Sequence, residues 1–470
     1  MIDSKLLISP SSFIKVIGNI PNLTSMVLST DSRSLEAGNL FLALSGENFD
    51  GFKFVECTLK KGALGAIFEK KEGREEQLKK LVKAFPDRFF VIVENSLIYF
   101  QELAKIKTQN WLNSDSERKI IGITGSNGKT TYKEMLSWLL DAIHPGKVHY
   151  SKGNFNNHIG VPLTLLNLRS DHKIAVIELG TNHPGEIQAL CEIAQPNAGI
   201  ITSIGSSHLE HFGTQEAVFE EKRSLFDYVR KNNGPESVFV LPSDDFFLKR
   251  LIDESVISFG LKDSYAKLEV EAEAVKIWLG KGHSPTLLKN ENILGEHNFS
   301  NLAGSFLMAS HLFPGNNNSL KEAAEKFKVP HNRGAWVRKS GKHFFLDAYN
   351  ANPSSMMKSL EGFIGFCHDK SISFDECLFV LGDMNELGSK SEAFHEEVGR
   401  FMLDKKITKT LFIGQYATSY QSGFLKKSTM FQSVEELRPF WEKEKEKFKY
   451  FFIKASRSLQ LESLMDITFD

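Results

Sequence analysis

The segment Ile120-Ile-Gly-Ile-Thr-Gly-Ser-Asn-Gly-Lys-Thr-Thr131 decides the fold class of this 470-residue chain. Its first five residues predict a buried strand, and the residues from Tyr132 to Leu140 predict a helix. A glycine-rich turn between a strand and a helix can surround phosphate oxygens with its backbone N–H groups and with the N-terminus of the helix. The segment therefore predicts a nucleotide-binding α/β domain.

The residue types in this turn suit phosphate binding. Gly125 and Gly128 allow the backbone to approach a ligand, Lys129 supplies a point charge, and the hydroxyl of Thr130 can reach Mg²⁺. Ile123 stands where the full Walker pattern has its first glycine, so a plain strand–turn–helix connection is the alternative. The candidate nucleotide-binding residues are Gly125, Ser126, Asn127, Gly128, Lys129, Thr130 and Thr131.

Short apolar runs alternate with amphipathic stretches along the whole chain, which is typical of α/β layers. Strands are predicted at residues 40–44, 66–68, 89–93, 120–124, 174–178, 198–203, 238–241, 344–347, 377–381 and 410–413. The polar run 113–118 and the turn 313–319 interrupt the pattern. They predict three domains, with limits at residues 1–115, 116–314 and 315–470.

Composition excludes several classes of protein. Hydrophobic residues make up 41% and charged residues 24% of the chain, and the formal net charge is −1. This balance predicts ordered domains and no global attraction to nucleic acid or to an anionic membrane. The sequence shows no run of about 18 apolar residues and no signal-peptide pattern at its start, so we expect a cytoplasmic protein that is not inserted in a membrane. The four cysteines lack metal-site spacing and are expected to be mostly buried.

Two polar side chains follow predicted strands. Glu178 ends one apolar strand, and His208 lies in the loop after the next. Open α/β sheets place ligand-binding groups at such positions, and a carboxylate suits Mg²⁺. Alternatively, Glu178 caps the next helix and His208 is only solvated.

Lys222 lies on an apolar stripe. Val218, Leu225 and Val229 follow helical spacing, and Lys222 falls on the same face. Burial of an ammonium group is costly, so this lysine should be paired, deprotonated or modified. The alternative is a side chain that reaches water from the edge of the stripe.

Two later loop-like segments carry amides, an aromatic ring and a carboxylate. Asn298 and Asn301 begin a predicted helix, Arg333 precedes a glycine, and Asp347 and Tyr349 follow a strand. These groups could cap helices and close turns. They could equally contact a base and a ribose.

Four segments are distinctive: Lys152-Gly-Asn-Phe-Asn-Asn-His-Ile-Gly-Val-Pro162, Glu178-Leu-Gly-Thr-Asn-His-Pro-Gly-Glu186, Asp347-Ala-Tyr-Asn-Ala-Asn-Pro353 and Gly382-Asp-Met-Asn-Glu-Leu-Gly388. Together with the glycine-rich turn they resemble the Mur ligase family. The resemblance runs from Thr30-Asp-Ser-Arg33 into the C-terminal domain. It implies a central P-loop-type ATPase sheet, an N-terminal UDP-binding α/β domain and a C-terminal Rossmann-like domain.

The resemblance also implies roles for individual residues. ATP would bind at residues 125–131, with Asn298, Asn301, Arg333, Asp347 and Tyr349 on its adenine, ribose or phosphates. Mg²⁺ would be held by Thr130, Glu178, His208 and Lys222, the last matching a carbamylated lysine of the family. Catalysis would depend on Lys129, Glu178, His208 and Lys222. The substrate-binding positions would be Ser32, Arg33, Gly46, Glu47, Asn48, Phe49, Asp50, Asn154, Asn156, Asn157 and His183. Phe52 departs from the family, whose members often carry histidine there.

The activity implied is the ATP-dependent joining of D-alanyl-D-alanine to UDP-N-acetylmuramoyl-tripeptide through an acyl phosphate. We expect a monomer by default. One alternative is a sister ligase that adds a single amino acid to the same nucleotide, or glutamate to a folate, although the Asp-Ser-Arg segment speaks against a folate. Another is an ATP-gated binding module that forms no peptide bond. His183 is a candidate base for the attacking amine, and a structural role in its loop is the alternative.

Overall fold

Three β-sheets organise the chain. The computed structural model describes residues 2–23, 25–46, 49–205, 209–262, 264–271, 273–279, 284–330 and 332–465. Within these ranges the sheets have five, nine and six strands, and helices pack on each. The prediction of three α/β domains is confirmed. Two compact units are also defined: Met1–Gly122 with Gly146–Thr181 and Glu186–Ala198, and Ile123–Pro145 with Asn182–Gly185 and Gly199–Asp470.

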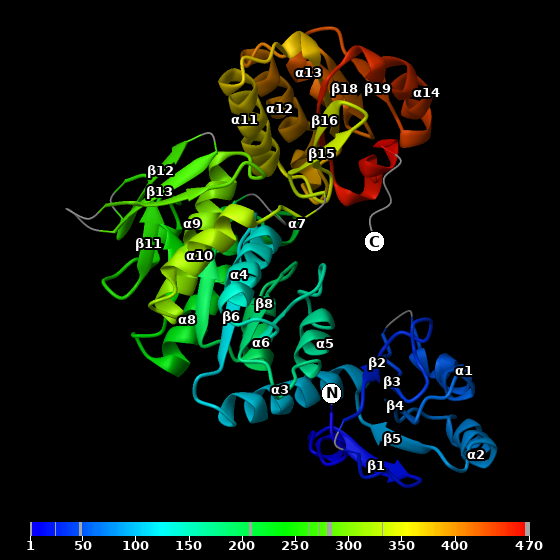
Figure 1. Ribbon diagram of the computed structural model, residues 1–470. Coiled ribbons are helices and arrows are strands. Elements are labelled where there is room, and N and C mark those ends of the chain that lie inside the picture. Colours follow the sequence, from blue (N-terminus) through cyan, green and yellow to red (C-terminus); the bar gives the residue numbers. More distant parts are fainter. Residues whose placement is uncertain are drawn as a thin grey trace. The chain divides into compact units, whose positions relative to one another are not determined.

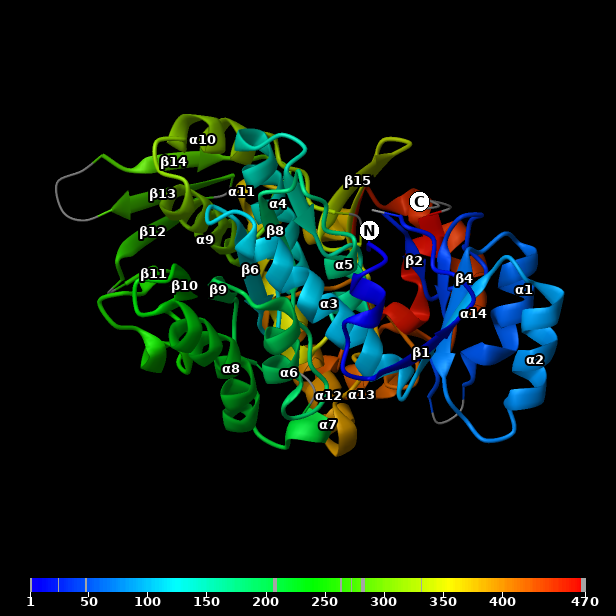
Figure 2. The same cartoon turned by 90° about the horizontal axis from the view of Figure 1, so that it is seen from below.

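The N-terminal sheet has the order β1-β5-β4-β3-β2. Its strands are β1 (Phe13–Ile17), β2 (Leu28–Ser29), β3 (Leu40–Leu42), β4 (Gly65–Glu69) and β5 (Phe89–Val93), and only β1 pairs antiparallel with its neighbour. Helices α1 (Val55–Lys60) and α2 (Glu75–Ala84) lie side by side (Figure 2). Their apolar side chains pack on Phe41, Phe68 and Phe90. Helix α3 (Ser96–Asn113) follows, begun by the Asn95 side chain.

The central sheet has the order β14-β13-β12-β11-β10-β9-β6-β8-β7. Its strands are β6 (Lys119–Thr124), β7 (Val148–Tyr150), β8 (Ile174–Glu178), β9 (Ala198–Ile201), β10 (Phe239–Pro242), β11 (Ile257–Gly260), β12 (Ala266–Glu271), β13 (Ala274–Leu279) and β14 (Thr286–Lys289). The last three pair antiparallel. Its helices are α4 (Lys129–Ile143), α5 (Gly160–Leu166), α6 (Glu186–Ala194), α7 (Leu209–Phe212), α8 (Gln215–Asn233), α9 (Glu296–Leu312) and α10 (Asn317–Lys326).

Helix α10 is tied to the elements of the second unit that precede it. The Trp138 indole on α4 donates to the Ala323 carbonyl at 2.8 Å. The Asn290 amide after β14 donates to the carbonyls of Ala324 and Phe327 at 2.7 and 2.9 Å. Helix α10, which follows the turn at 313–319, therefore still packs with elements of the central sheet. The chain enters the six-stranded sheet at Ala335. The domain limits given above stay predictions.

The C-terminal sheet is covered on both faces (Figure 1). Its order is β15-β16-β20-β17-β18-β19, with β15 (Ala335–Lys339), β16 (Lys342–Asp347), β17 (Cys377–Gly382), β18 (Thr410–Ile413), β19 (Thr429–Phe431) and β20 (Tyr450–Lys454). Phe345 and Phe379 face α11 (Pro353–Asp369), α12 (Ser391–Asp404) and α13 (Ala417–Phe424). Phe344 and Leu378 face α14 (Val434–Glu444). Because successive strand residues point to opposite faces, β17 is buried throughout.

Two further observations concern the helices and the cysteines. None of the helices described here has the length and apolar content needed to cross a membrane. Cys191, Cys367 and Cys377 are buried as expected, whereas Cys57 is exposed on α1.

Candidate functional site

The glycine-rich turn has a backbone that requires glycine at two positions. It joins β6 to α4, as predicted. Gly125 has φ +147°, and a Cβ atom there would lie 1.9 Å from Thr202 Oγ1. Gly128 has φ +81° and is the N-cap residue of α4. Side chains at these positions would be strained, so the two glycines fix the path of the turn.

The end of β9 holds this turn in place. The Ser126 N–H donates to the Ser203 carbonyl at 2.8 Å, and the Asn127 N–H donates to Ser203 Oγ at 3.1 Å. The Thr202 hydroxyl donates to the Asn127 carbonyl at 2.5 Å. Thr202 and Ser203 were not among the predicted site residues, because only their position at a strand end marks them.

Lys129 begins α4 and reaches back over the turn. Its ammonium group donates to the Gly125 carbonyl at 2.6 Å and to the Ser126 carbonyl at 3.4 Å. The positive end of the helix dipole lies at the same place. Ammonium charge, helix N-terminus and glycine backbone are therefore concentrated within one turn of chain, which is the arrangement that binds anions.

We expect Gly125→Ala to destabilise the second unit. The new Cβ overlaps Thr202 Oγ1 and occupies a disfavoured φ, a strain of about 1–3 kcal/mol before the overlap is counted. Thermal unfolding of the full chain should show a lowered Tm. Gly146→Ala is the matched control, because Gly146 also has positive φ (+70°) but its Cβ would meet nothing within 4 Å. Equal Tm changes in both variants would contradict the close approach at Gly125.

Asparagines from distant segments contact the turn. A Cβ on Gly128 would lie 3.1 Å from Asn301 Nδ2, so the Asn301 amide on α9 sits beside the start of α4. The Asn352 amide donates to Asn127 Oδ1 at 2.6 Å. Asn352 also caps α11 by accepting from the Ser355 N–H. Asn352 is a contact residue that sequence reasoning missed, although it lies in one of the quoted motifs.

The remaining predicted nucleotide residues of the second unit are each held by neighbours. Asn298 is buried on α9 and donates to the Leu294 carbonyl at 2.9 Å. The Arg333 guanidinium lies 3.7 Å from the centre of the Tyr349 ring. Asp347 at the end of β16 accepts from Lys454 at 2.5 Å and from Ser359 at 2.6 Å. Asp347 therefore has a protein cation as its partner in this structure.

Lys222 faces the interior of the second unit, as the apolar stripe predicted. It is 1% exposed, and Val218, Leu225 and Val229 are buried with it. Burial lowers the pKa of the Lys222 ammonium group well below its ordinary value, and the positive charge of Lys129 lowers it further. The charge of Glu221 opposes this shift. Glu221 in turn accepts from the Gly185 N–H at 2.7 Å.

Glu178 lies in the first unit, where its carboxylate and backbone are both held. It is buried at the end of β8, and the Asn156 amide donates to Glu178 Oε1 at 2.9 Å. The Ser151 hydroxyl accepts from the Glu178 N–H at 3.1 Å. Asn157 accepts from the Ile159 and Gly160 N–H groups at the start of α5. The carbonyl of Asn154 accepts from the Asn156 N–H at 2.7 Å.

Some predicted site residues lie outside the described ranges, namely Glu47, Asn48 and His208. The chain before His208 is described as far as Gly205. The Gly205 N–H donates to Ser126 Oγ at 2.9 Å, and the Ile204 N–H donates to Asp245 at 2.8 Å. His183 is exposed, and its ring centre lies 4.4 Å from that of His211.

The Asp-Ser-Arg segment forms an ion pair. Arg33 Nη2 lies 2.8 Å from Asp31, and both side chains are solvent-exposed. The hydrogen bond from Arg33 lowers the pKa of Asp31 to about 2. The carbonyl of Ser32 accepts from the Lys61 ammonium group at 2.8 Å. The Asp-Ser-Arg segment is therefore a salt-bridged turn in this structure.

Comparison with known proteins identifies related sequences over most of the chain. The family model "Mur ligase family, catalytic domain" matches residues 26–97, "Mur ligase middle domain" matches residues 123–309, and "Mur ligase, glutamate ligase domain" matches residues 332–438. The UDP-N-acetylmuramoyl-tripeptide–D-alanyl-D-alanine ligase of Buchnera aphidicola subsp. Baizongia pistaciae (strain Bp) is 30% identical over 457 residues, covering 93% of this chain and 91% of the relative.

Solved structures give the same result. MurF from Acinetobacter baumannii superposes with a TM-score of 0.82 at 26% identity, over 99% of this chain and 98% of that one. The MurF ligase from Thermotoga maritima, solved in complex with ADP, has a TM-score of 0.76 at 25% identity, over 94% and 96% of the two chains. An adenine nucleotide is therefore bound by a protein with this fold.

Proposed function

Because this chain belongs to the Mur ligase family, whose members are ATP-dependent ligases, we propose that it joins D-alanyl-D-alanine to UDP-N-acetylmuramoyl-tripeptide. The observation that carries the proposal is the turn at residues 125–131, with its two positive-φ glycines and Lys129 folded over it. That turn would supply the nucleotide site, and the activity of the related ligase indicates the two substrates. We further propose that the enzyme acts as a monomer in the cytoplasm, where ATP is available.

The proposed reaction has two steps. A carboxylate oxygen of the tripeptide attacks the γ-phosphorus of ATP, the bond to the β-phosphate oxygen breaks, and ADP leaves. The amine of D-alanyl-D-alanine then attacks the acyl carbon, loses a proton and displaces phosphate. A free carboxylate is a poor acyl donor, so phosphorylation provides the leaving group. Lys129 would move from the turn carbonyls to the phosphate oxygens and balance the charge that builds on them.

Thr130, Glu178, His208 and Lys222 are the proposed Mg²⁺ ligands. The buried carboxylate of Glu178, oriented by Asn156, fits a hard cation, and so does the Thr130 hydroxyl at the start of α4. Among the residues described, no three His, Cys, Asp or Glu side chains gather into a metal cluster. When bound, Mg²⁺ would neutralise phosphate charge.

We propose that Lys222 becomes carbamylated. Burial lowers its pKa and so favours the neutral amine, whose nitrogen can attack CO₂, releasing one proton and forming an anionic carbamate. Such an anion would offer oxygen ligands to Mg²⁺ where the ammonium group cannot. The remaining predicted contacts stay proposals. Asn298, Asn301, Arg333, Asp347 and Tyr349 would hold the nucleotide, and His183 would accept the proton of the attacking amine.

The proposed substrate contacts are Ser32, Arg33, Gly46, Glu47, Asn48, Phe49, Asp50, Asn154, Asn156, Asn157 and His183. A single incubation series tests the function. ATP, Mg²⁺, UDP-N-acetylmuramoyl-tripeptide and D-alanyl-D-alanine are combined with the protein, and phosphate release and the peptide product are measured with each component omitted. Product that requires all four supports the proposal. Phosphate release that ignores D-alanyl-D-alanine, or activity with single amino acids or folate instead, would overturn it.

A further inference from the structure

Ser45 and Asp50 of the N-terminal domain pair with each other, and we call this pair of residues the neck. These two residues form an antiparallel bridge. The Gly46 N–H donates to the Phe49 carbonyl at 2.8 Å, and the Gly51 N–H donates to the Leu44 carbonyl at 2.8 Å. Asp50 caps the short helix Gly51–Phe54 by accepting from the Phe52 N–H at 3.1 Å. The backbones of Gly46 and Phe49 are thus fixed next to Ser45 and Asp50.

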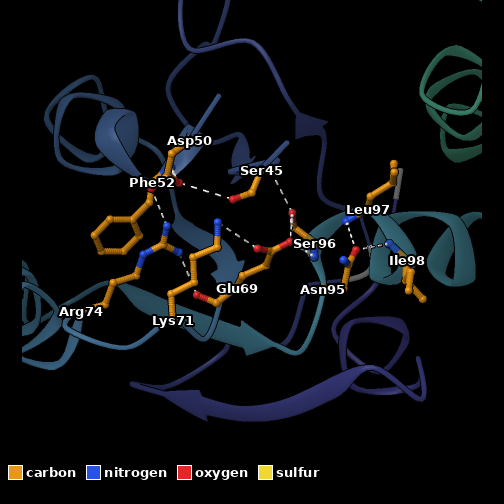
Figure 3. Close-up of polar contacts among 10 residues, drawn as sticks. All are labelled: Ser45, Asp50, Phe52, Glu69, Lys71, Arg74, Asn95, Ser96, Leu97 and Ile98. Atoms are coloured by element: carbon orange, nitrogen blue, oxygen red, sulfur yellow. Dashed lines mark hydrogen bonds and ion pairs between the residues drawn. The ribbon is translucent and has the colours of Figure 1, made fainter. Parts of the chain in front are cut away.

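Ser45 and Asp50 belong to a closed ring of hydrogen bonds with Arg74, Glu69 and Ser96 (Figure 3). The Ser45 hydroxyl donates to Asp50 at 3.4 Å, and Arg74 Nη2 donates to the other Asp50 oxygen at 2.5 Å. Arg74 Nη1 donates to the Glu69 carbonyl at 2.9 Å. The Glu69 carboxylate accepts from the Ser96 hydroxyl at 3.0 Å, and that hydroxyl accepts from the Ser45 N–H at 3.1 Å. The ring joins the neck to the end of β4 and the start of α3.

Arg74 joins Asp50 to Glu69 within the ring. Arg74 is buried, and its guanidinium group lies 4.5 Å from the centre of the Phe52 ring. The planar fork places one nitrogen on Asp50 and the other on Glu69 at the same time, which an ammonium group cannot do with the same geometry. Burial alone would raise the pKa of Asp50, but the hydrogen bonds from Arg74 and the Phe52 N–H lower it, so this carboxylate is held charged.

Phe49 lies just beyond the neck. Its side chain is 56% exposed and stacks on Phe54, with ring centres 5.9 Å apart and planes inclined by 21°. An exposed pair of stacked aromatic rings offers an apolar face, and burial of such a face against a ligand is favourable. A rigid neck would keep this face oriented for the ligand and so lower the entropic cost of binding.

We propose that Arg74 is a positioning residue for the nucleotide-sugar substrate. It fixes Asp50, and through Asp50 the orientation of Phe49, without contacting the substrate itself. This inference rests on the proposed function, because it takes Gly46, Phe49 and Asp50 as residues that bind the UDP-linked substrate.

Kinetics and binding of the full chain test the inference. In Arg74→Met, we expect KM for UDP-N-acetylmuramoyl-tripeptide to rise about tenfold, with kcat and KM for ATP within about twofold of wild type, since uniform substrate binding is what is lost. Arg74→Lys should give an intermediate rise. In the Asp50→Asn background, Arg74→Met should add little, because the two residues act through one contact. Lys79→Ala is the matched control, an exposed cation on α2, the helix that Arg74 precedes, and it forms an ion pair with Glu76.

Calorimetric titration with the UDP-tripeptide needs no turnover, and it separates this inference from the proposed reaction. Wild-type protein that binds the nucleotide-sugar about tenfold more tightly than Arg74→Met supports the inference even if no peptide bond forms. Equal affinities in wild type, Arg74→Met and Arg74→Lys would overturn it. So would a lowered Tm in Arg74→Met and Arg74→Lys with KM unchanged, because Arg74 would then serve stability alone. Absence of nucleotide-sugar binding by folded wild type would also overturn it.

Discussion

Lys129→Ala should lower kcat by about 10³-fold or more, because the substitution removes the charge that would face the transferred phosphoryl group. Lys129 is the cation that lies on the turn itself, 2.6 Å from the Gly125 carbonyl. Its loss also removes a positive charge near the buried Lys222, so the fold should tolerate the change. Steady-state phosphate release with saturating substrates measures the effect, and Tm checks that the variant is folded.

Lys231→Ala provides the comparison for that experiment. Lys231 is an exposed lysine near the C-terminus of α8 in the same unit, and its removal should leave kcat unchanged. Retention of more than about a tenth of wild-type turnover by folded Lys129→Ala would show that the turn does not act on the γ-phosphate.

The strands predicted from sequence are mainly continuous apolar runs, although one such run, β20, was missed. The five residues of β5 are all buried and all apolar, so periodicity alone identifies them. The strand β12 was not predicted, because it alternates buried residues with Lys267 and Glu269. Its antiparallel partner β13 was not predicted either. The strand β20 follows the charged run 442–449, yet it lies between β16 and β17 in its sheet. Its position depends on pairing with segments far away in the sequence.

The same distinction applies to the candidate site. The turn from Gly125 to Lys129 could be predicted because strand, glycines and lysine are adjacent in the sequence. The inward orientation of Lys222 followed from helical spacing. The contact of Asn352 with Asn127 joins residues 225 positions apart, and no local pattern encodes it. Thr202 beside Gly125 is a similar case, because the pairing of β9 within the sheet brings it there.

Lys222→Met should separate stability from activity. A methionine of similar length removes a buried amine whose charged form is disfavoured in the interior, so the variant should unfold at an equal or higher Tm than the wild type. Turnover should nevertheless fall by about 10²–10³-fold if the carbamate helps to balance phosphate charge. Bicarbonate added after removal of CO₂ should raise the activity of the wild type and leave that of Lys222→Met unchanged.

The difference in stability between the wild type and Lys222→Met should change with pH in a definite direction. Because burial lowers the pKa of Lys222 in the folded protein, the unfolded chain binds one more proton at any pH between the folded value and about 10.4. In that window the Lys222 side chain makes the wild type more stable as pH rises, by up to about 1.4 kcal/mol per pH unit. Lys222→Met lacks this slope, so its advantage over the wild type should be largest at low pH and shrink as pH rises. Denaturant midpoints in CO₂-free buffer measure it, with Lys231→Met as the exposed control. A constant difference across the window would mean that Lys222 keeps its proton in the folded protein, and the route from neutral amine to carbamate would then be closed.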